Sequence, residues 1–109
     1  MSAIDFNGLD TAVHGPLRLG VLTTLQTQGA TDFTSLKELL QATDGSLGMH
    51  LQKLEEIGYI QCHKAFVGRK PKSTYTISGA GRRALLKYIE NLQAIVDLVR
   101  NAPPRKKTR

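Results

Sequence analysis

The chain has 109 residues, of which 40% are hydrophobic and 22% charged, and its formal net charge is +6. This length fits one domain and is too short for two independent cores. The single cysteine, Cys62, excludes an intramolecular disulfide and a zinc site built from several cysteines. No apolar run approaches the roughly 20 residues of a membrane span, and no signal-peptide pattern opens the chain, so we expect a cytoplasmic protein.

Apolar periodicity and capping residues predict two short helices in the first part of the chain. Pro16 fits the first position of the first helix, where its missing N–H has no cost, and Gly29 fits the end of that helix. The second helix is expected at Ser35–Ala42, because Ser35 and Glu38 have the spacing of a capping box. Both helices carry leucines at helical spacing, which predicts that they share a core.

A third helix is expected at Gly45–Ile57, after a turn at Thr43–Gly45. Leucines at positions 47, 51 and 54 define its buried face. The other side carries small and polar groups, with no acidic residue before Glu55. A helix that enters a DNA groove needs such a slender, carboxylate-free surface, although the same surface would also suit a helix that faces only water.

The pattern then becomes typical of strands. Tyr59–Phe66 and Lys72–Ile77 are rich in aromatic and β-branched residues, and Val67–Pro71 has the composition of a turn. We therefore expect a β-hairpin that carries Arg69 and Lys70 at its tip.

Ser78 is expected to cap a long helix at Gly79–Arg100. Apolar residues in this helix are spaced by 3, 4, 3 and 4, which is typical of a seam that packs on another helix. The seam consists of Leu85, Tyr88, Leu92, Ile95 and Val99. A second apolar row lies beside it, and a monomer of this size cannot easily cover both rows, so we expect a homodimer through this helix. The alternative is a helix that folds back across its own first helix.

The positive charge is unevenly distributed along the chain. All nine acidic residues lie between Asp5 and Asp97, together with ten of the fifteen lysines and arginines, so residues 1–99 carry a net charge of only +1. Seven basic residues and no acidic ones lie between Gln61 and Tyr88. This asymmetry favours nucleic acid over a membrane as the partner, because no strongly amphipathic basic helix accompanies the cluster; the alternative is a solvated basic surface.

Three helices followed by a hairpin form the element order of a winged helix-turn-helix, an α+β and mainly α fold. The segment Leu47–Ile60 resembles the recognition-helix signature of MarR-, ArsR- and PadR-type regulators, in which a His-Leu-x-x-Leu-Glu-x-x-Gly-Tyr/Leu core recurs. The segment Gly68–Arg82 resembles the wing and the following helix start of their small stand-alone members. The resemblance covers about residues 15 to 99 and implies a homodimeric transcriptional regulator that binds a two-fold related operator. Met49 stands where many relatives have a polar or basic residue, and Gly48 replaces a commoner serine, which removes one expected phosphate contact.

We expect residues 1–101 to form the DNA-binding domain and residues 102–109 to form a basic tail, which either follows DNA or only improves solubility. Base edges would be read by Met49, His50 and Gln52. Phosphates would be held by Ser35, Ser46, Lys53, Arg69, Lys70 and Lys72.

We expect a repressor that binds double-stranded DNA and blocks polymerase, because no separate activation surface is visible in the sequence. One alternative is a protein-interaction module of the same fold, and another is a repressor with an effector site at the dimer interface. No catalytic residue, cofactor or metal site is expected. Cys62 and His63 are adjacent on a strand, so their side chains point to opposite faces.

Overall fold

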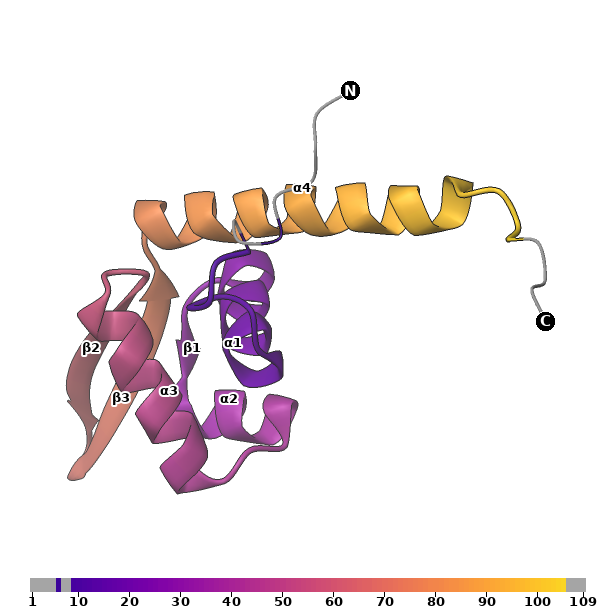
Figure 1. Ribbon diagram of the computed structural model, residues 1–109. Coiled ribbons are helices and arrows are strands. Elements are labelled where there is room, and N and C mark those ends of the chain that lie inside the picture. The colour runs from indigo at the N-terminus through magenta and orange to yellow at the C-terminus, as the bar shows by residue number, and fades with distance from the viewer. Residues whose placement is uncertain (1–5, 7–8, 106–109) are drawn as a thin grey trace.

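The computed structural model describes residue 6 and residues 9–105 of the chain (Figure 1). Residues 106–109 of the predicted basic tail lie outside the described residues. The elements, in chain order, are α1 (Pro16–Gln28), β1 (Thr31–Asp32), α2 (Phe33–Leu40), α3 (Asp44–Glu56), β2 (Ile60–Val67), β3 (Lys70–Ile77) and α4 (Gly79–Asn101). The strands form an antiparallel sheet in the order β1-β3-β2. No helix in the described part of the chain is long and apolar enough to span a membrane.

The start of α2 corrects the sequence prediction. Asp32, not Ser35, is the N-cap residue, and its carboxylate accepts the backbone N–H of Ser35 at 2.8 Å. Pairing of Asp32 with Thr74 on β3 fixes the extended conformation that a cap residue needs. The helix therefore begins two residues earlier than the capping-box spacing indicated.

The turn between α2 and α3 also differs from the expected one. Gln41 ends α2 in the left-handed conformation (φ 52°), and the N–H of Ala42 then bonds to the carbonyl of Lys37 at 3.1 Å. Thr43 caps α3 by accepting the N–H of Ser46 at 3.2 Å. The helix starts at Asp44, so the expectation that no acidic residue precedes Glu55 is wrong, although Lys37 pairs with Asp44 at 2.8 Å.

The hairpin is longer and its turn is tighter than predicted. Each strand has eight residues, and only Gly68 and Arg69 lie between the paired residues Val67 and Lys70. Gly68 has a φ of 66°, as the first central residue of a two-residue hairpin turn of type II′ requires. Lys70 and its neighbour Pro71 therefore belong to β3 rather than to the turn.

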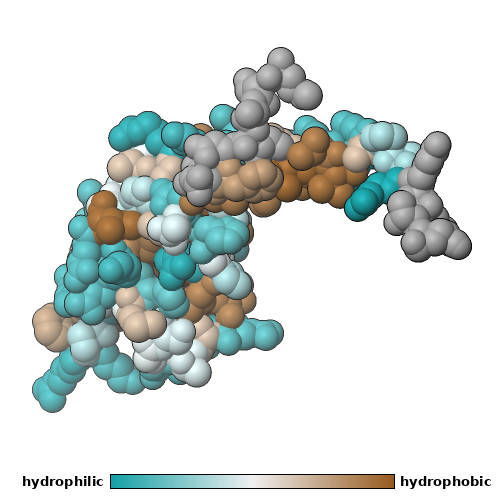
Figure 2. Space-filling model, viewed as in Figure 1, coloured by the Kyte–Doolittle hydropathy of each residue, from teal (hydrophilic) through white to brown (hydrophobic). Residues whose placement is uncertain are grey.

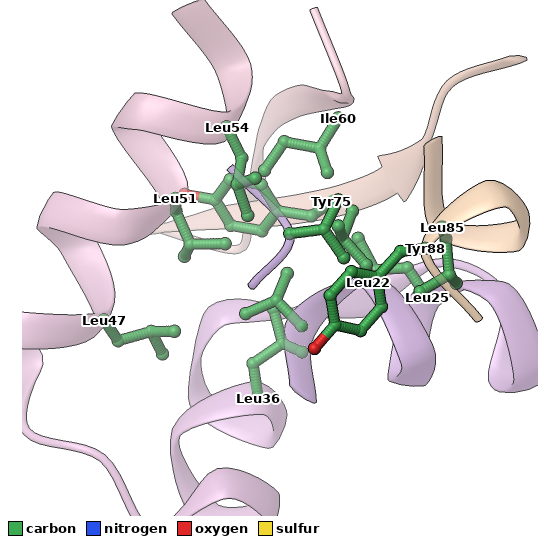
Figure 3. Packing of buried hydrophobic residues seen from close by; sticks show 12 residues of the cluster. Leu22, Leu25, Leu36, Leu47, Leu51, Leu54, Ile60, Tyr75, Leu85 and Tyr88 are labelled. Atoms are coloured by element: carbon green, nitrogen blue, oxygen red, sulfur yellow. The ribbon is translucent and has the colours of Figure 1, made fainter. Parts of the chain in front are cut away.

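The core lies where α1, α2 and α3 meet the sheet (Figure 3). The three leucines of α3 at positions 47, 51 and 54 are buried, as their periodicity predicted. Ile60 and Tyr75 close the core from the sheet, and Leu85 and Tyr88 enter it from α4. Burial of apolar side chains from all four α-helices makes α4 an integral part of the domain.

Much of α4 extends past this core (Figure 1). The helix has 23 residues, which is about 35 Å at 1.5 Å per residue. The Cα radius of gyration is 17.6 Å, whereas about 13 Å is expected for a compact domain of this length. The overhang accounts for this elongation, and Figure 2 shows an apolar patch on its visible side, bordered by hydrophilic residues.

Replacing Asp32 is expected to test the α2 cap. The hydrogen bonds from Ser35, assisted by nearby Lys72, hold the pKa of Asp32 below its ordinary value. Because the pKa is lower in the folded state, this carboxylate stabilises the fold above its unfolded pKa, and the stabilisation disappears as the pH falls through the folded pKa. Asp32→Ala should lower the free energy of unfolding at neutral pH by about 1 kcal/mol.

Asp32→Asn is the matched control for the charge, since asparagine can still cap the helix. Urea unfolding should show that the deficit of this variant relative to the wild type shrinks on acidification. A deficit that stays constant through acid pH would contradict the role assigned to the ionised carboxylate.

Candidate nucleic-acid interface

The surface of α3 opposite its buried leucines is open to solvent. Met49 is 62% exposed, and Gln52 and Lys53 are also exposed. A hollow on this surface is bordered by four predicted DNA contacts, Met49, His50, Gln52 and Lys53, together with Arg18 and Glu56. The structure therefore brings all three predicted base-reading residues, Met49, His50 and Gln52, onto one connected surface.

A second hollow lies between α3 and the hairpin. Gly48 and Gln52 border it from α3, while Lys64 borders it from β2. Gln52 thus lies between the two hollows, at the centre of the exposed α3 surface. Glu55 and Glu56 also line the second hollow and place negative charge at the C-terminal end of α3.

Arg69 and Lys70 are exposed at the tip of the hairpin, and neither forms an ion pair with another described residue. Two unpaired cations at an exposed tip suit contact with phosphates. Sequence reasoning missed the apolar surface beside them, where Phe66 is 75% exposed and Val67 is 63% exposed. Phe66 pairs with Pro71 across the strands, so the tip combines cations with an apolar pair.

Two of the predicted phosphate contacts, Ser35 and Lys72, lie apart from the hollow on α3. Both border a separate hollow that contains Asp32. The Asp32 carboxylate accepts the N–H of Ser35, and it pairs with the Lys72 ammonium at 3.4 Å. The Asp32 carboxylate already occupies the N-terminus of α2, where a phosphate was expected, and the contact of Ser35 and Lys72 with phosphates stays a prediction.

Ser46 is half-buried in the first turn of α3. Its backbone N–H is held by the Thr43 hydroxyl, and its side chain borders a hollow shared with Pro16 and Leu17 of α1. It lies on the same helix as Met49 but outside the hollow that gathers the base-reading residues.

Tyr75 is a buried residue on β3, the second strand of the hairpin. It pairs with Cys62 across the strands, and burial together with a hydrogen bond to Cys62 raises the pKa of Tyr75 to about 12. Within the part of the chain that the structure describes, no three His, Cys, Asp or Glu residues are grouped so that they could hold a metal ion.

The apolar seam of α4 is divided by the edge of the domain. Leu85 and Tyr88 are only 2% and 4% exposed because they pack into the core of the same chain, so the prediction that they face a partner is corrected. Leu92 is 37% exposed and Val99 is 70% exposed, while Ile95 between them is half-buried. Only the second half of the seam is free for a partner.

Comparisons with known proteins agree with this architecture. A family model described as a winged helix DNA-binding domain matches residues 17–96. An uncharacterized protein of Methanocaldococcus jannaschii is 37% identical over 73 residues, which cover 67% of this chain and 79% of that protein.

Solved structures share the same arrangement of elements. A transcriptional regulator homologue from Pyrococcus horikoshii OT3 superposes with a TM-score of 0.78 at 23% identity, covering 85% of this chain and 93% of that one. A MarR family regulator from Neisseria meningitidis has a TM-score of 0.58 at 21% identity, covering 77% of this chain and 58% of that one. The α+β winged helix-turn-helix predicted from the sequence is confirmed.

Proposed function

The chain belongs to the winged helix DNA-binding domain family, and from that premise we propose that it is a homodimeric repressor that binds a two-fold related operator. The family consists of DNA-binding domains and not of enzymes. The observation that carries the proposal is the exposed surface of α3 around Gln52, flanked by a hairpin whose two tip cations are unpaired within the described residues.

The α3 helix suits the major groove of duplex DNA, which is about 12 Å wide. Gln52 can pair with adenine through its amide, and Met49 can contact the methyl group of thymine. Lys53 on the same surface, and Arg69 and Lys70 on the hairpin, supply the charge for the flanking phosphates.

The overhang of α4 supports the homodimer. Its exposed apolar residues continue a face whose first half is already buried in the domain. A second copy that packs the same face would cover both overhangs by two-fold symmetry. Such a pair would present two α3 helices to successive major grooves, which are about 34 Å apart.

Repression follows from occupancy of the operator. The exposed features described above serve DNA contact and pairing, and a bound dimer would exclude polymerase from an overlapping promoter.

Substitution of both tip cations tests the DNA interface. Lys53, Arg69 and Lys70 of both protomers make about six phosphate contacts, which predict a slope near −5 for the logarithm of affinity against the logarithm of salt concentration. Arg69→Ala with Lys70→Ala removes about four of these contacts from the dimer and should bring the slope to about −2. Fluorescence anisotropy with mixed-sequence duplex DNA at several salt concentrations would measure both slopes.

The matched control removes two cations from the start of α4, far from the hairpin tip in Figure 1, by Arg83→Ala with Lys87→Ala. It should leave the slope near the wild-type value. Equal slopes for the wild type and the hairpin variant would remove the hairpin from the interface.

A further inference from the structure

Arg18 of α1 contacts a residue of the DNA-reading surface. Its Nη1 lies 3.1 Å from Nδ1 of His50 on α3, although the two residues are 32 positions apart in the sequence. Both residues border the hollow that contains Met49 and Gln52. No sequence motif singled out Arg18, because the contact depends on how α1 packs on α3.

The rest of the arginine is held in place. Its Nη2 donates to the backbone carbonyl of His14 at 3.2 Å, and the His14 ring in turn lies 2.8 Å from the hydroxyl of Tyr88 on α4. Gly15 leaves room for the guanidinium, since a Cβ there would lie 2.8 Å from Arg18 Nη2. The side chain is thus held by neighbours from two segments, the loop before α1 and helix α3, and His14 in that loop is itself held by Tyr88.

No carboxylate in the described part of the chain forms an ion pair with Arg18. Its buried Nε also lacks a hydrogen-bond partner there. Charge pairing within the protein therefore does not explain why an arginine occupies this half-buried position. The contact with His50 is its one link to the α3 surface.

The chemistry of the two side chains fixes their roles. A guanidinium remains protonated and can only donate hydrogen bonds. His50 Nδ1 must therefore accept, which requires a neutral imidazole whose single N–H is at Nε2.

We propose that Arg18 is a positioning residue that holds His50 in the Nε2–H tautomer, so that His50 presents a hydrogen-bond donor to a base edge. This proposal rests on the proposed function for its DNA partner. In the major groove the donor fits N7 or O6 of guanine, N7 of adenine or O4 of thymine, and it does not fit the amino groups of adenine and cytosine. Guanine offers two such acceptors, so the base pair that faces His50 is expected to prefer guanine on the contacted strand.

Imidazole ¹⁵N NMR of the free protein tests the tautomer without DNA. At a pH where His50 is neutral, the wild type should show a protonated Nε2 and an unprotonated Nδ1. Arg18→Met, which keeps an unbranched apolar stem but removes the donors, should give shifts averaged between the two tautomers. Arg18→Lys, which restores a donor, should return the spectrum toward that of the wild type.

A proton on Nδ1 in the wild type would overturn the proposal. Identical His50 spectra for the wild type and Arg18→Met would overturn it as well. If Arg18→Met does not fold, the wild-type spectrum and the Arg18→Lys variant still decide the question.

A DNA experiment tests the consequence for recognition. Fragments selected by the wild type from random duplexes define the operator, and His50→Ala identifies the base pair that His50 reads. Arg18→Met should reduce discrimination at that base pair by about three- to ten-fold, the value of one hydrogen bond, and leave the salt dependence unchanged. Unchanged discrimination would contradict the positioning role, whereas failure of the wild type to bind any duplex would contradict the proposed function and leave the NMR result to stand separately.

Discussion

Replacing Gly81 with alanine is expected to lower the free energy of unfolding by about 3 kcal/mol, the upper part of the range for overpacked sites. A Cβ at Gly81 would lie 2.1 Å from the carbonyl oxygen of Tyr59 and 3.0 Å from Cγ1 of Ile77. The Tyr59 carbonyl cannot easily move away, because it accepts the N–H of Ser78 at 2.9 Å. Relief of the clash would require α4 to separate from the start of the hairpin.

Gly79→Ala is the matched control two residues earlier in α4. A Cβ at Gly79 would meet only the end of the flexible Arg83 side chain, at 3.3 Å. We expect its urea midpoint to stay close to that of the wild type, whereas the midpoint of Gly81→Ala falls. A Gly81→Ala protein that unfolds at the wild-type urea concentration would show that the close approach of the two backbones is not needed.

Two charges on the overhang of α4 are expected to separate the proposed dimer. Leu92→Glu with Val99→Glu places carboxylates on the exposed half of the apolar seam, where pairing would bury them close to the same charges of a second copy. Loss of the pair removes the second, intramolecular binding step, so operator affinity should fall by about 100-fold or more. Light scattering would give the mass of the protein, and a titration with the selected operator would give the affinity.

Ala94→Glu with Asn101→Glu is the control, with the same spacing of seven residues and the same exposed helix, but on the side of α4 away from the seam. It should retain the dimer mass and the affinity. If Leu92→Glu with Val99→Glu also retains the dimer mass, pairing does not use this face.

Periodicity predicted the α3 helix well because one strong repeat controls it. The buried leucines at positions 47, 51 and 54 set which side of the helix faces the core, and Met49 and Gln52 then had to face outward. Helix ends were predicted less well, because Asp32 and Ser35 are both good cap residues. The choice between them depends on the pairing of β1 with β3, which a local pattern does not contain.

Contacts between distant segments explain the remaining differences. The seam of α4 has one continuous period, but the point at which the core ends, between Tyr88 and Leu92, depends on how α4 crosses the domain. Lys72 was predicted to contact a phosphate because it is positively charged. The sequence gives no sign that Asp32 lies beside it in the folded chain and pairs with it. Arg18 meets His50 for the same reason, since the packing of α1 on α3 brings them together.

Ser78 joins the loop between α3 and β2 to the start of α4. Its hydroxyl donates to the carbonyl of Gly58 at 2.5 Å and accepts the N–H of Gly81 at 3.0 Å, while its own N–H donates to Tyr59. The loop between α3 and β2 is thereby fixed to the start of α4. In the proposed dimer, a small change in the crossing angle of the two α4 helices would therefore rotate both DNA-binding domains as rigid bodies and change the distance between the two α3 helices. A signal that changes this angle would directly change how well the dimer fits its operator.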